Sequence, residues 1–344
     1  MQDLTSGFPS FGSGRDSRIV QPMSLKVVMT LGPASAERPV IEELLATADR
    51  FRLNGSHVGG PDGLRNWLDR LREIFTDLRR SVPVILDLQG AKMRVGPIPT
   101  VSELPPAVRL VRNGRPSSSA AIIGVPHREL FDQVRTGEEL SLNDGRIRLR
   151  VESVAPDEIQ TRVVINGPLS SHKGINRADH PIPMRALADN DQELLEVAEQ
   201  YPFIQYAFSF VHTGDEADIL RKRTRRHIVA KVERPEAMPH LRAIDNQFDE
   251  VWFCRGDLGE QAGIARLGEL QHDFRVALQA FDHPSYLAGQ VLEHMTRFDQ
   301  PTRSEVVHLW DVERAGWEGI VLSDETAVGS NPVAVAQFLE SLRG

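Results

Sequence analysis

Cysteine is almost absent from this sequence of 344 residues, which contains only Cys254. A single cysteine excludes an intrachain disulfide and a zinc site built from several cysteines, and it fits a reducing compartment. Its position within an apolar run is typical of a small core residue. No apolar stretch approaches the length needed to span a bilayer, and the first 22 residues lack the apolar segment of a signal peptide. We therefore expect a cytoplasmic protein without a membrane partner.

An excess of positive charge is missing as well. Lysine and arginine number 40 against 48 aspartate and glutamate residues, so the formal net charge is -8. Proteins that bind nucleic acids are usually basic, so the composition argues against a nucleic-acid partner. Neither common phosphate-binding motif, GxxxxGK[ST] or GxGxxG, is present. A nucleotide would have to be held by other means.

Short apolar runs alternate with amphipathic segments over most of the chain. Such runs are typical of strands buried on both faces of a parallel sheet, and they occupy residues 26–30, 50–53, 83–86, 204–210, 228–232, 251–254, 286–288 and 319–322. Helical spacing of apolar residues is found at 37–48, 62–80, 189–200, 215–226, 236–244, 263–281, 304–315 and 332–342. Eight strands alternating with helices predict an α/β protein with a (β/α)8 TIM barrel.

Between residues 97 and 183 the pattern changes. Alternating polar and apolar residues at 146–151 and 161–165 are typical of half-exposed antiparallel strands, and the segment Asn143-Asp144-Gly145 predicts a tight turn. We expect a small β-barrel lid domain at 97–183, inserted after the third barrel strand. The barrel itself would comprise 23–96 and 184–344, and residues 1–22 would form a flexible arm.

Two of the buried runs end abruptly on charged residues. Lys231 and Glu233 end the fifth strand and point to the same side of it, because side chains alternate along a strand, and Asp257 follows the sixth. Charged groups at the end of a buried strand are costly unless they hold another charge. In a parallel barrel this end is the active-site mouth. The pattern leaves two interpretations open, a catalytic site and a structural ion pair.

Other polar residues also follow the ends of expected strands. They are Arg52, Asn54, Ser56 and His57 at the second strand, Asp87, Gln89, Lys92 and Arg94 after the third, and Ser323 and Glu325 after the eighth. Arginine and lysine suit an anionic substrate, whereas Mg²⁺ commonly takes one or two carboxylates and completes its shell with water and substrate oxygens. The pair Glu233 and Asp257 meets that requirement.

Seven segments, in order along the chain, resemble motifs of the pyruvate kinase family. They are 26–35 (KVVMTLGPAS), 52–57 (RLNGSH), 87–94 (DLQGAKMR), 230–236 (AKVERPE), 255–259 (RGDLG), 301–306 (PTRSEV) and 323–327 (SDETA). Within the insertion, 143–145 (NDG) and 171–176 (SHKGIN) resemble the family's lid domain. The resemblance implies a phosphotransferase that moves the phosphoryl group of phosphoenolpyruvate to ADP with Mg²⁺ or Mn²⁺, giving pyruvate and ATP.

The resemblance also assigns roles to individual residues. Lys231 would stabilise the phosphoryl group in flight, Arg52 and Arg94 would neutralise its oxygens, and Glu233 and Asp257 would bind the divalent metal. The expected catalytic set is completed by Lys92, Ser323 and Glu325. The ADP side would be lined by His57, Asp144 and Lys173. The expected substrate-binding set also includes Asn54, Gly256, Asp257 and Gly289.

Three residues, Asn54, Ser56 and Asp87, match the family's ligands for a monovalent cation. Leu88 stands where the fourth ligand is usually Thr, and Lys92 replaces the usual Glu. This combination is similar to the potassium-independent branch of the family, in which a lysine ammonium takes the place of the ion. A fixed cation can supply the same field as K⁺, so we expect that K⁺ is not required.

The sequence departs from the family pattern at several places. Gly289 occupies the position of a Thr that belongs to the group handling the enolpyruvate carboxylate and proton delivery, and the segment 208–212 ends on His212 rather than Arg. The sequence stops at Gly344, where the family continues into a C-terminal domain that binds effectors and builds the tetramer. We therefore expect no regulation of the family kind, and a homodimer rather than a tetramer.

Two alternative functions stay open at this stage. The change at Gly289 favours a metal-dependent aldolase, lyase or hydrolase that acts on pyruvate or another 2-oxo acid through an enolate stabilised by Lys231. A non-catalytic regulatory protein that binds phosphoenolpyruvate is the second alternative, although the intact Lys231, Glu233 and Asp257 argue against it.

Four histidines outside these motifs are expected to be structural. His272, His283, His294 and His308 show no metal-ligand spacing, and we assign them to helix surfaces.

Overall fold

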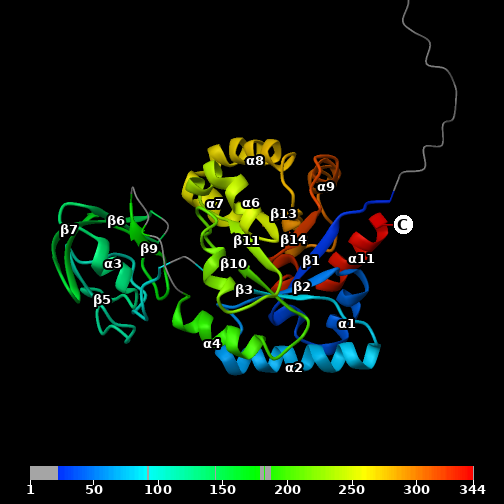
Figure 1. Cartoon of the computed structure of the whole chain (residues 1–344), viewed down its shortest axis with the longest axis horizontal. Coiled ribbons are helices and arrows are strands. Elements are labelled where there is room, and N and C mark those ends of the chain that lie inside the picture. Colours follow the sequence, from blue (N-terminus) through cyan, green and yellow to red (C-terminus); the bar gives the residue numbers. More distant parts are fainter. Residues whose placement is uncertain (1–21, 91–92, 144, 179–181, 183–186, 344) are drawn as a thin grey trace, which may run out of the picture.

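The computed structural model describes residues 22–90, 93–143, 145–178, 182 and 187–343. Eight parallel strands close into a barrel in the order β1-β14-β13-β12-β11-β10-β3-β2 (Figure 1). They are β1 (Lys26–Leu31), β2 (Arg50–Asn54), β3 (Val84–Leu88), β10 (Ile204–Phe208), β11 (Ile228–Val232), β12 (Glu250–Cys254), β13 (Ser285–Ala288) and β14 (Gly319–Leu322). The ring is closed because β1 pairs with both β14 and β2. The expected (β/α)8 barrel is confirmed.

Helices surround the barrel at the expected places. They are α1 (Arg38–Thr47), α2 (Gly60–Leu78), α4 (Asp189–Ala198), α5 (Ala217–Arg221), α6 (Leu241–Gln247), α8 (Ile264–Leu278), α9 (Arg303–Arg314) and α11 (Pro332–Arg343). The longest, α2, buries Leu64, Leu68, Leu71, Ile74 and Phe75 on one face, as its apolar spacing predicts. It ends two residues earlier than expected, at Leu78, whose side chain is 43% exposed rather than part of that face.

Two expected helices differ for local reasons. The segment that starts after β11 is first a 3₁₀ helix, Pro235–His240, because Pro239 lacks the N–H that an α-helical bond requires at that position. The segment expected at 215–226 is helical only over α5, since the Thr224 hydroxyl accepts the N–H of Arg226 in place of a backbone carbonyl.

Short helices that the apolar spacing did not predict follow two strands directly. α7 (Arg255–Ala262) starts at the end of β12, and α10 (Asp324–Ala327) starts one residue after β14. Two further 3₁₀ turns occur at Pro33–Ser35 and Glu293–Thr296. Residues 255–257 and 323–325 therefore belong to helix beginnings at the mouth of the barrel, rather than to open loops.

The barrel separates two apolar layers. One layer lies between the strands and the surrounding helices. The other fills the interior of the barrel and comprises Val28, Ile85, Ala207, Val229, Trp252, Cys254, Tyr286, Ala288 and Val321. Alternate residues along a strand point to opposite faces, so both faces of these strands are buried, as the continuous apolar runs predicted.

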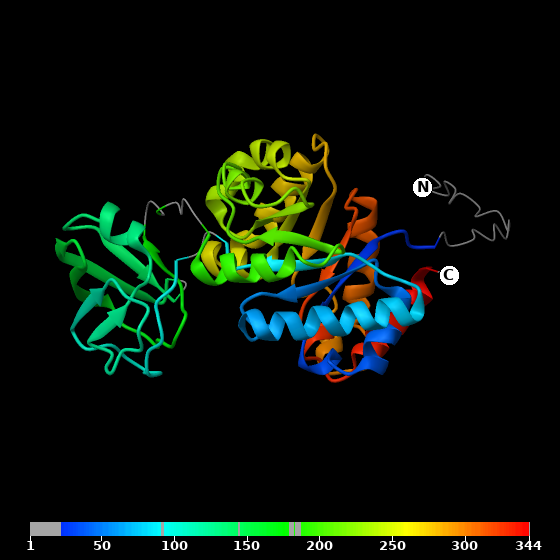
Figure 2. The ribbon, with the colours of Figure 1, turned by 60° about the horizontal axis from the view of Figure 1, so that its bottom comes forward.

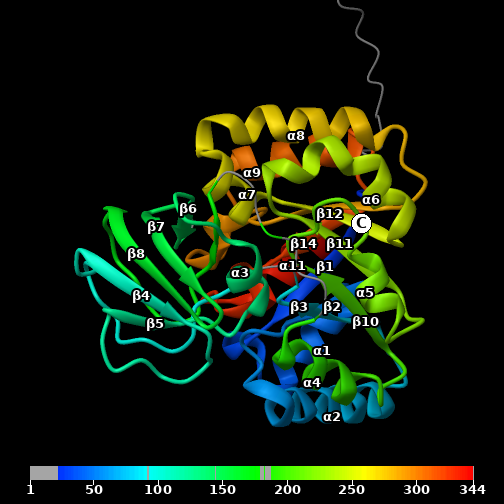
Figure 3. The same ribbon diagram turned by 60° about the vertical axis from the view of Figure 1, so that its left-hand side comes forward.

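The insertion forms a separate six-stranded sheet beside the barrel (Figures 1 and 3). Its strands are β4 (Ala107–Val111), β5 (Ile122–Gly124), β6 (Glu139–Leu142), β7 (Ile147–Ala155), β8 (Glu158–Ile165) and β9 (Ile175–Arg177), with α3 (Arg128–Gln133) between β5 and β6. Between β6 and β7, where a turn is expected, Arg146 N–H donates to the Asn143 carbonyl, while Asp144 lies outside the described residues. The pair β4–β5 is parallel, which the pattern of antiparallel strands did not predict. Within the described residues β5 and β9 are the edges of this sheet.

The expected domain boundaries stay predictions, because part of the return connection, residues 179–181 and 183–186, lies outside the described residues. The same holds for residues 1–21 of the expected arm. Figure 2 shows α11 on the side of the barrel that faces away from the inserted sheet. In the part of the chain that is described, no helix combines the length and apolar character that crossing a membrane requires.

Candidate active site

A cavity of about 720 Å³ opens at the carboxyl ends of the barrel strands and extends to residues 171–173 of the insertion. Most of the expected site residues line it, namely Arg52, Asn54, Ser56, His57, Asp87, Arg94, Lys173, Lys231, Glu233, Gly256, Asp257, Gly289 and Ser323. Glu325 is not among the lining residues, and Lys92 and Asp144 lie outside the described residues. Residues from seven separate chain segments are thus brought to one cavity.

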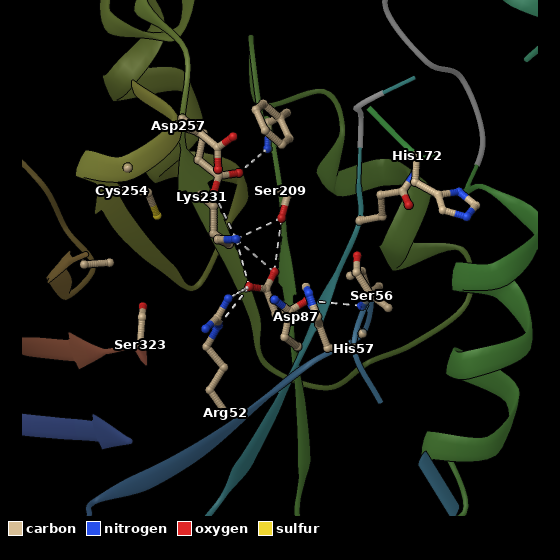
Figure 4. A pocket seen from close by; sticks show the side chains of 18 of the residues that line it. Arg52, Ser56, His57, Asp87, His172, Ser209, Lys231, Cys254, Asp257 and Ser323 are labelled. Carbon is tan, nitrogen blue, oxygen red and sulfur yellow. Dashed lines mark hydrogen bonds and ion pairs between the residues drawn. The ribbon is translucent and has the colours of Figure 1, made fainter. Parts of the chain in front are cut away.

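Lys231 lies at the centre of the charged groups (Figure 4). Its ammonium contacts both oxygens of Asp87 at 2.8 and 3.1 Å, the Ser209 hydroxyl at 2.9 Å and Glu233 Oε1 at 3.0 Å. Lys231 and Glu233 therefore point to the same side, as the alternation along β11 predicted. All three charged groups are buried.

Arg52 completes the same cluster from β2. Its Nε and one terminal nitrogen donate to Asp87 Oδ2 at 2.8 and 2.5 Å, and the other terminal nitrogen donates to the Thr30 hydroxyl at 2.9 Å. Asp87 thus accepts from two cationic side chains at once (Figure 4). Because the Asp87 carboxylate holds both Lys231 and Arg52, two positive charges are fixed at the cavity wall.

These contacts set the protonation of the cluster. Burial alone would raise the pKa of Asp87, but Lys231 and Arg52 outweigh it and lower that pKa below its ordinary value. Burial alone would lower the pKa of Lys231, whereas Asp87 and Glu233 raise it. Both groups are therefore ionised at neutral pH, and Lys231 serves as a permanent cation rather than as a base.

Glu233 and Asp257 lie on the side of the cavity expected to hold the divalent metal. Burial raises the pKa of Glu233; Lys231 opposes that shift, and the neighbouring carboxylates of Asp257 and Asp87 add to it. A buried carboxylate beside a second one is stabilised by a divalent cation. No cluster of three or more His, Cys, Asp or Glu side chains suited to a metal is present in the described part of the chain. Mg²⁺ needs only one or two carboxylates, so the residues fit this ion.

The two candidates after β14 differ in position. Ser323 lines the cavity, whereas the fully buried Glu325 accepts three backbone N–H groups. They belong to Val291 and Leu292 at 3.1 Å and to Ser323 at 2.7 Å. The contacts of Glu325 therefore hold the backbone around β13 and β14, and its expected catalytic role stays a prediction.

The expected monovalent-cation ligands have protein partners. Asn54 Oδ1 accepts the Ser56 N–H at 3.1 Å, and the Gly55 N–H donates to the Asp87 carbonyl at 2.9 Å. Leu88, which replaces a ligand in the family pattern, lines the cavity beside them. Positive charge near Asp87 is supplied by Arg52 and Lys231.

The insertion also lines the cavity, through residues 171–173. Arg94 donates to the His172 carbonyl at 2.9 Å, and its backbone N–H donates to His127 Nε2 at 2.9 Å. His172 and Lys173 line the cavity together with His57 of the barrel. Of the three residues expected on the nucleotide side, His57 and Lys173 thus line the cavity, while Asp144 lies outside the described residues.

Another part of the cavity lining consists of Gly256, Asp257 and Gly289. Gly256 and Asp257 lie in the first turn of α7, and the N-terminal end of a helix favours an anion. Gly289 has φ +88°, and a Cβ at this position would lie 3.4 Å from the Gly256 nitrogen. The position that carries Thr in the family pattern is thus without a side chain and has a left-handed backbone.

Sequence reasoning missed two residues that organise the site. Ser209 follows β10 and contacts both Lys231 and Asp87, so the rule that points to strand ends could have found it. The buried Asp191, at the start of α4, accepts the N–H groups of Gln89 and Gly90 at 3.0 and 2.9 Å. No sequence spacing links positions 89 and 191, so only the fold reveals this contact.

The comparisons with known proteins agree with the geometry. A protein-family model described as "Pyruvate kinase, barrel domain" matches residues 23–336. A pyruvate kinase of Agrobacterium vitis is 30% identical over 92% of this chain and 68% of its own length, and one of Thermococcus litoralis is 32% identical over the same shares. The crystal structure of a pyruvate kinase from Pyrobaculum aerophilum is similar in fold, with a TM-score of 0.73 at 24% identity over 93% of this chain and 73% of that one.

Proposed function

Because this chain belongs to the pyruvate kinase family of phosphotransferases, we propose that it transfers the phosphoryl group of phosphoenolpyruvate to ADP. The bond between phosphorus and the enolpyruvate oxygen breaks, and a bond to a terminal oxygen of ADP forms. The enolate then takes up a proton to give pyruvate. Phosphoryl transfer of this kind depends mainly on positioning and on neutralising the charge of the transferred group.

The observation that carries the proposal is the fixed position of Lys231 within the cavity. Its ammonium is held by Asp87, Glu233 and Ser209, so it cannot turn away when the cavity is filled. A cation that is already oriented stabilises charge in the transition state without reorganisation. Arg52, fixed by Asp87 and Thr30, acts in the same way from β2.

Glu233 and Asp257 are the residues that would hold Mg²⁺, which supplies positive charge to the substrate oxygens when it is bound. The first turn of α7, with Gly256 and Asp257, would receive the carboxylate of the acid substrate. His57, His172 and Lys173 would hold ADP between the barrel and the insertion. We also propose that the reaction does not require K⁺, since Lys92 takes the place of a Glu in the family pattern.

A second function is favoured by Gly289. This residue lines the cavity without a side chain, so the acid-binding end lacks the hydroxyl that the family pattern places there. An aldolase, lyase or hydrolase that stabilises the enolate of a 2-oxo acid with Lys231 and Mg²⁺ would use the same cluster. Retention of the lid-like insertion, with Lys173 at the cavity, favours the kinase.

A phosphorus NMR time course distinguishes the two functions. Purified protein is mixed with phosphoenolpyruvate, ADP and Mg²⁺, and the Lys231→Met variant is run in parallel. Growth of the ATP γ-phosphate signal with the original protein alone is the expected result. Absence of ATP, together with metal-dependent exchange of the methyl protons of pyruvate in deuterated water, would favour the enolate chemistry instead.

A further inference from the structure

Arg255 is the first residue of α7, and its guanidinium contacts a loop at the edge of the cavity and a helix outside it. Its Nε donates to the Gly289 carbonyl at 2.8 Å, and one terminal nitrogen donates to the Gln290 carbonyl at 2.8 Å. The other terminal nitrogen lies 3.0 Å from His308 Nε2 on α9. The guanidinium therefore links three elements: the start of α7, the loop after β13, and α9.

The loop held by Arg255 has an unusual backbone. Gly289 has φ +88° and Gln290 has φ +53°, so both residues are left-handed. A residue with a side chain adopts this conformation at a cost, and it persists only where the surroundings hold it. Arg255 holds the loop in this conformation, because the carbonyls of Gly289 and Gln290 both accept from its rigid planar guanidinium.

The same loop shapes the acid-binding edge of the cavity. Gly289 and Gly256 both line it, and the position of a Cβ on Gly289 would lie 3.4 Å from the Gly256 nitrogen. If Arg255 lost its hydrogen bonds to this loop, Gly289 would therefore be free to move away from the first turn of α7, where Gly256 and Asp257 lie. If the acid substrate binds here, as proposed, the distance between these two segments would set the space for its carboxylate.

His308 can take part in this arrangement only when it is neutral. A guanidinium always donates, so Nε2 of His308 must accept, which requires that this nitrogen carries no proton. Burial lowers the pKa of His308, and the charge of Arg255 lowers it further, while Asp311 acts in the opposite direction. Arg275 of α8 and Arg314 of α9 line the surface hollow beside His308, and Glu325 faces Arg255 from α10. The imidazole is thus predominantly neutral above its ordinary pKa of 6.5 and gains a proton only at lower pH.

We propose that Arg255 is a positioning residue for the acid-binding edge, and that protonation of His308 loosens its hold on Gly289 and Gln290. A protonated His308 would place a second cation 3.0 Å from the guanidinium and remove the acceptor. The inference rests on the proposed function in one respect, namely that the acid substrate occupies this edge. It predicts that the affinity for the acid substrate falls at low pH.

The test measures the KM for phosphoenolpyruvate and kcat separately between pH 8 and about pH 5.5. In the original protein KM should rise by up to roughly tenfold over this range, the limit set by an imidazole pKa of 6.5, while kcat changes less. His308→Gln keeps a neutral acceptor for Arg255, so its KM should stay low and lose this rise. An equal rise of KM in both proteins would overturn the role of His308.

The chain offers a matched control. His272 Nδ1 lies 3.4 Å from a terminal nitrogen of Arg275 on the exposed side of α8, a contact between the same two residue types away from the cavity. His272→Gln should leave the pH profile of KM as it is in the original protein. Arg255→Lys should raise KM at every pH, because a single ammonium nitrogen cannot replace the three separate nitrogens that reach Gly289, Gln290 and His308.

Amide hydrogen exchange separates failure of this inference from failure of the proposed function. At a single low pH, the peptide that contains Gly289 and Gln290 should exchange faster in the original protein than in His308→Gln, and fastest in Arg255→Lys. This measurement needs no turnover, so it decides the inference even if no ATP is formed. Equal exchange in all three proteins would refute it.

Discussion

Lys231 and Asp87 form an ion pair across the mouth of the barrel, with the Lys231 ammonium 2.8 and 3.1 Å from the two Asp87 oxygens. Their strands, β11 and β3, are not neighbours, because β10 lies between them. Ser209, which follows β10, bridges the gap by contacting both side chains. The pair is thus built on three adjacent strands, and we expect a change in either residue to affect both catalysis and folding.

Lys231→Met should lower the rate of phosphoryl transfer by on the order of a thousandfold, because a preorganised cation is removed from the transition state. It also leaves Asp87 and Glu233 buried without their ammonium, which should lower the free energy of unfolding by about 3–5 kcal/mol. Single-turnover kinetics and urea unfolding measure the two effects. Lys222→Met, at an exposed position after α5, is the control. Turnover unchanged in the Lys231 variant would refute the proposed role.

Asp87 should make the protein sensitive to acid. Its pKa is lowered in the folded state, so its contribution to stability is present above the unfolded pKa near 3.8 and is lost as the pH falls further. The difference in unfolding free energy between the original protein and Asp87→Asn should therefore be largest at neutral pH and shrink below about pH 4. Urea unfolding at several pH values measures it. A difference that does not change with pH would contradict this assignment.

Asp191 should show the opposite dependence. Burial raises its pKa to about 6, so its favourable contribution is complete below pH 3.8 and is lost as the pH rises through 6. Relative to Asp191→Asn, the original protein should lose on the order of 3 kcal/mol of stability between pH 4 and pH 7. Chemical unfolding of both proteins over this range provides the comparison. If the free energy of unfolding changed with pH equally in both proteins, a group other than Asp191 would cause the pH dependence.

Arg50 closes the opposite end of the barrel interior. Its two terminal nitrogens donate to Glu250 at 2.8 Å each, and its guanidinium lies 4.5 Å from the ring centre of Tyr286. Arg50→Met should cost about 3–5 kcal/mol of stability, because it removes the permanently charged partner of a buried carboxylate, which keeps only its contacts to His227 and the Trp252 indole N–H. Turnover at a temperature where the variant is folded should stay unchanged, since Arg50 does not line the cavity.

Arg150→Met is the matched control for this change. Arg150 also pairs with a glutamate, Glu139 at 2.6 Å, but both side chains are partly exposed on the inserted sheet. An exposed pair contributes about 0–1 kcal/mol, so this variant should unfold almost like the original protein. If thermal unfolding finds equal losses for Arg50→Met and Arg150→Met, burial is not what makes the first pair important.

Potassium should have little effect on activity. Lys92 is expected to supply the positive charge that the family pattern takes from a bound ion, so rates in KCl and NaCl at equal ionic strength should agree. Lys92→Glu should introduce a requirement for K⁺, because it restores a negative charge in place of the positive one. Steady-state rates in the two salts measure both effects. Strong stimulation of the original protein by KCl would show that Lys92 does not replace the ion.

The barrel could be predicted from local patterns because each barrel strand is buried on both faces. A run such as Ile228–Val232 must be apolar whatever its neighbours are, so the sequence identifies it directly. The expected boundaries failed where local chemistry competes with helical spacing, at Pro239 and Thr224. The parallel direction of the β4–β5 pair was not predicted for a different reason, since alternation identifies a strand but not the direction of its partner.

The sequence by itself determined the barrel and the charged residues that line its mouth, such as Lys231, Glu233 and Asp257, because strand ends are marked by an abrupt change from apolar to charged residues. The tertiary structure decided which charges meet. Asp87 and Lys231 are separated by 144 positions, and Arg255 and His308 by 53, so no local spacing links either pair. His308, assigned from spacing to a helix surface, is half-buried against Arg255. Closing the barrel brings the ends of distant strands together, and that closure places these residues at one site.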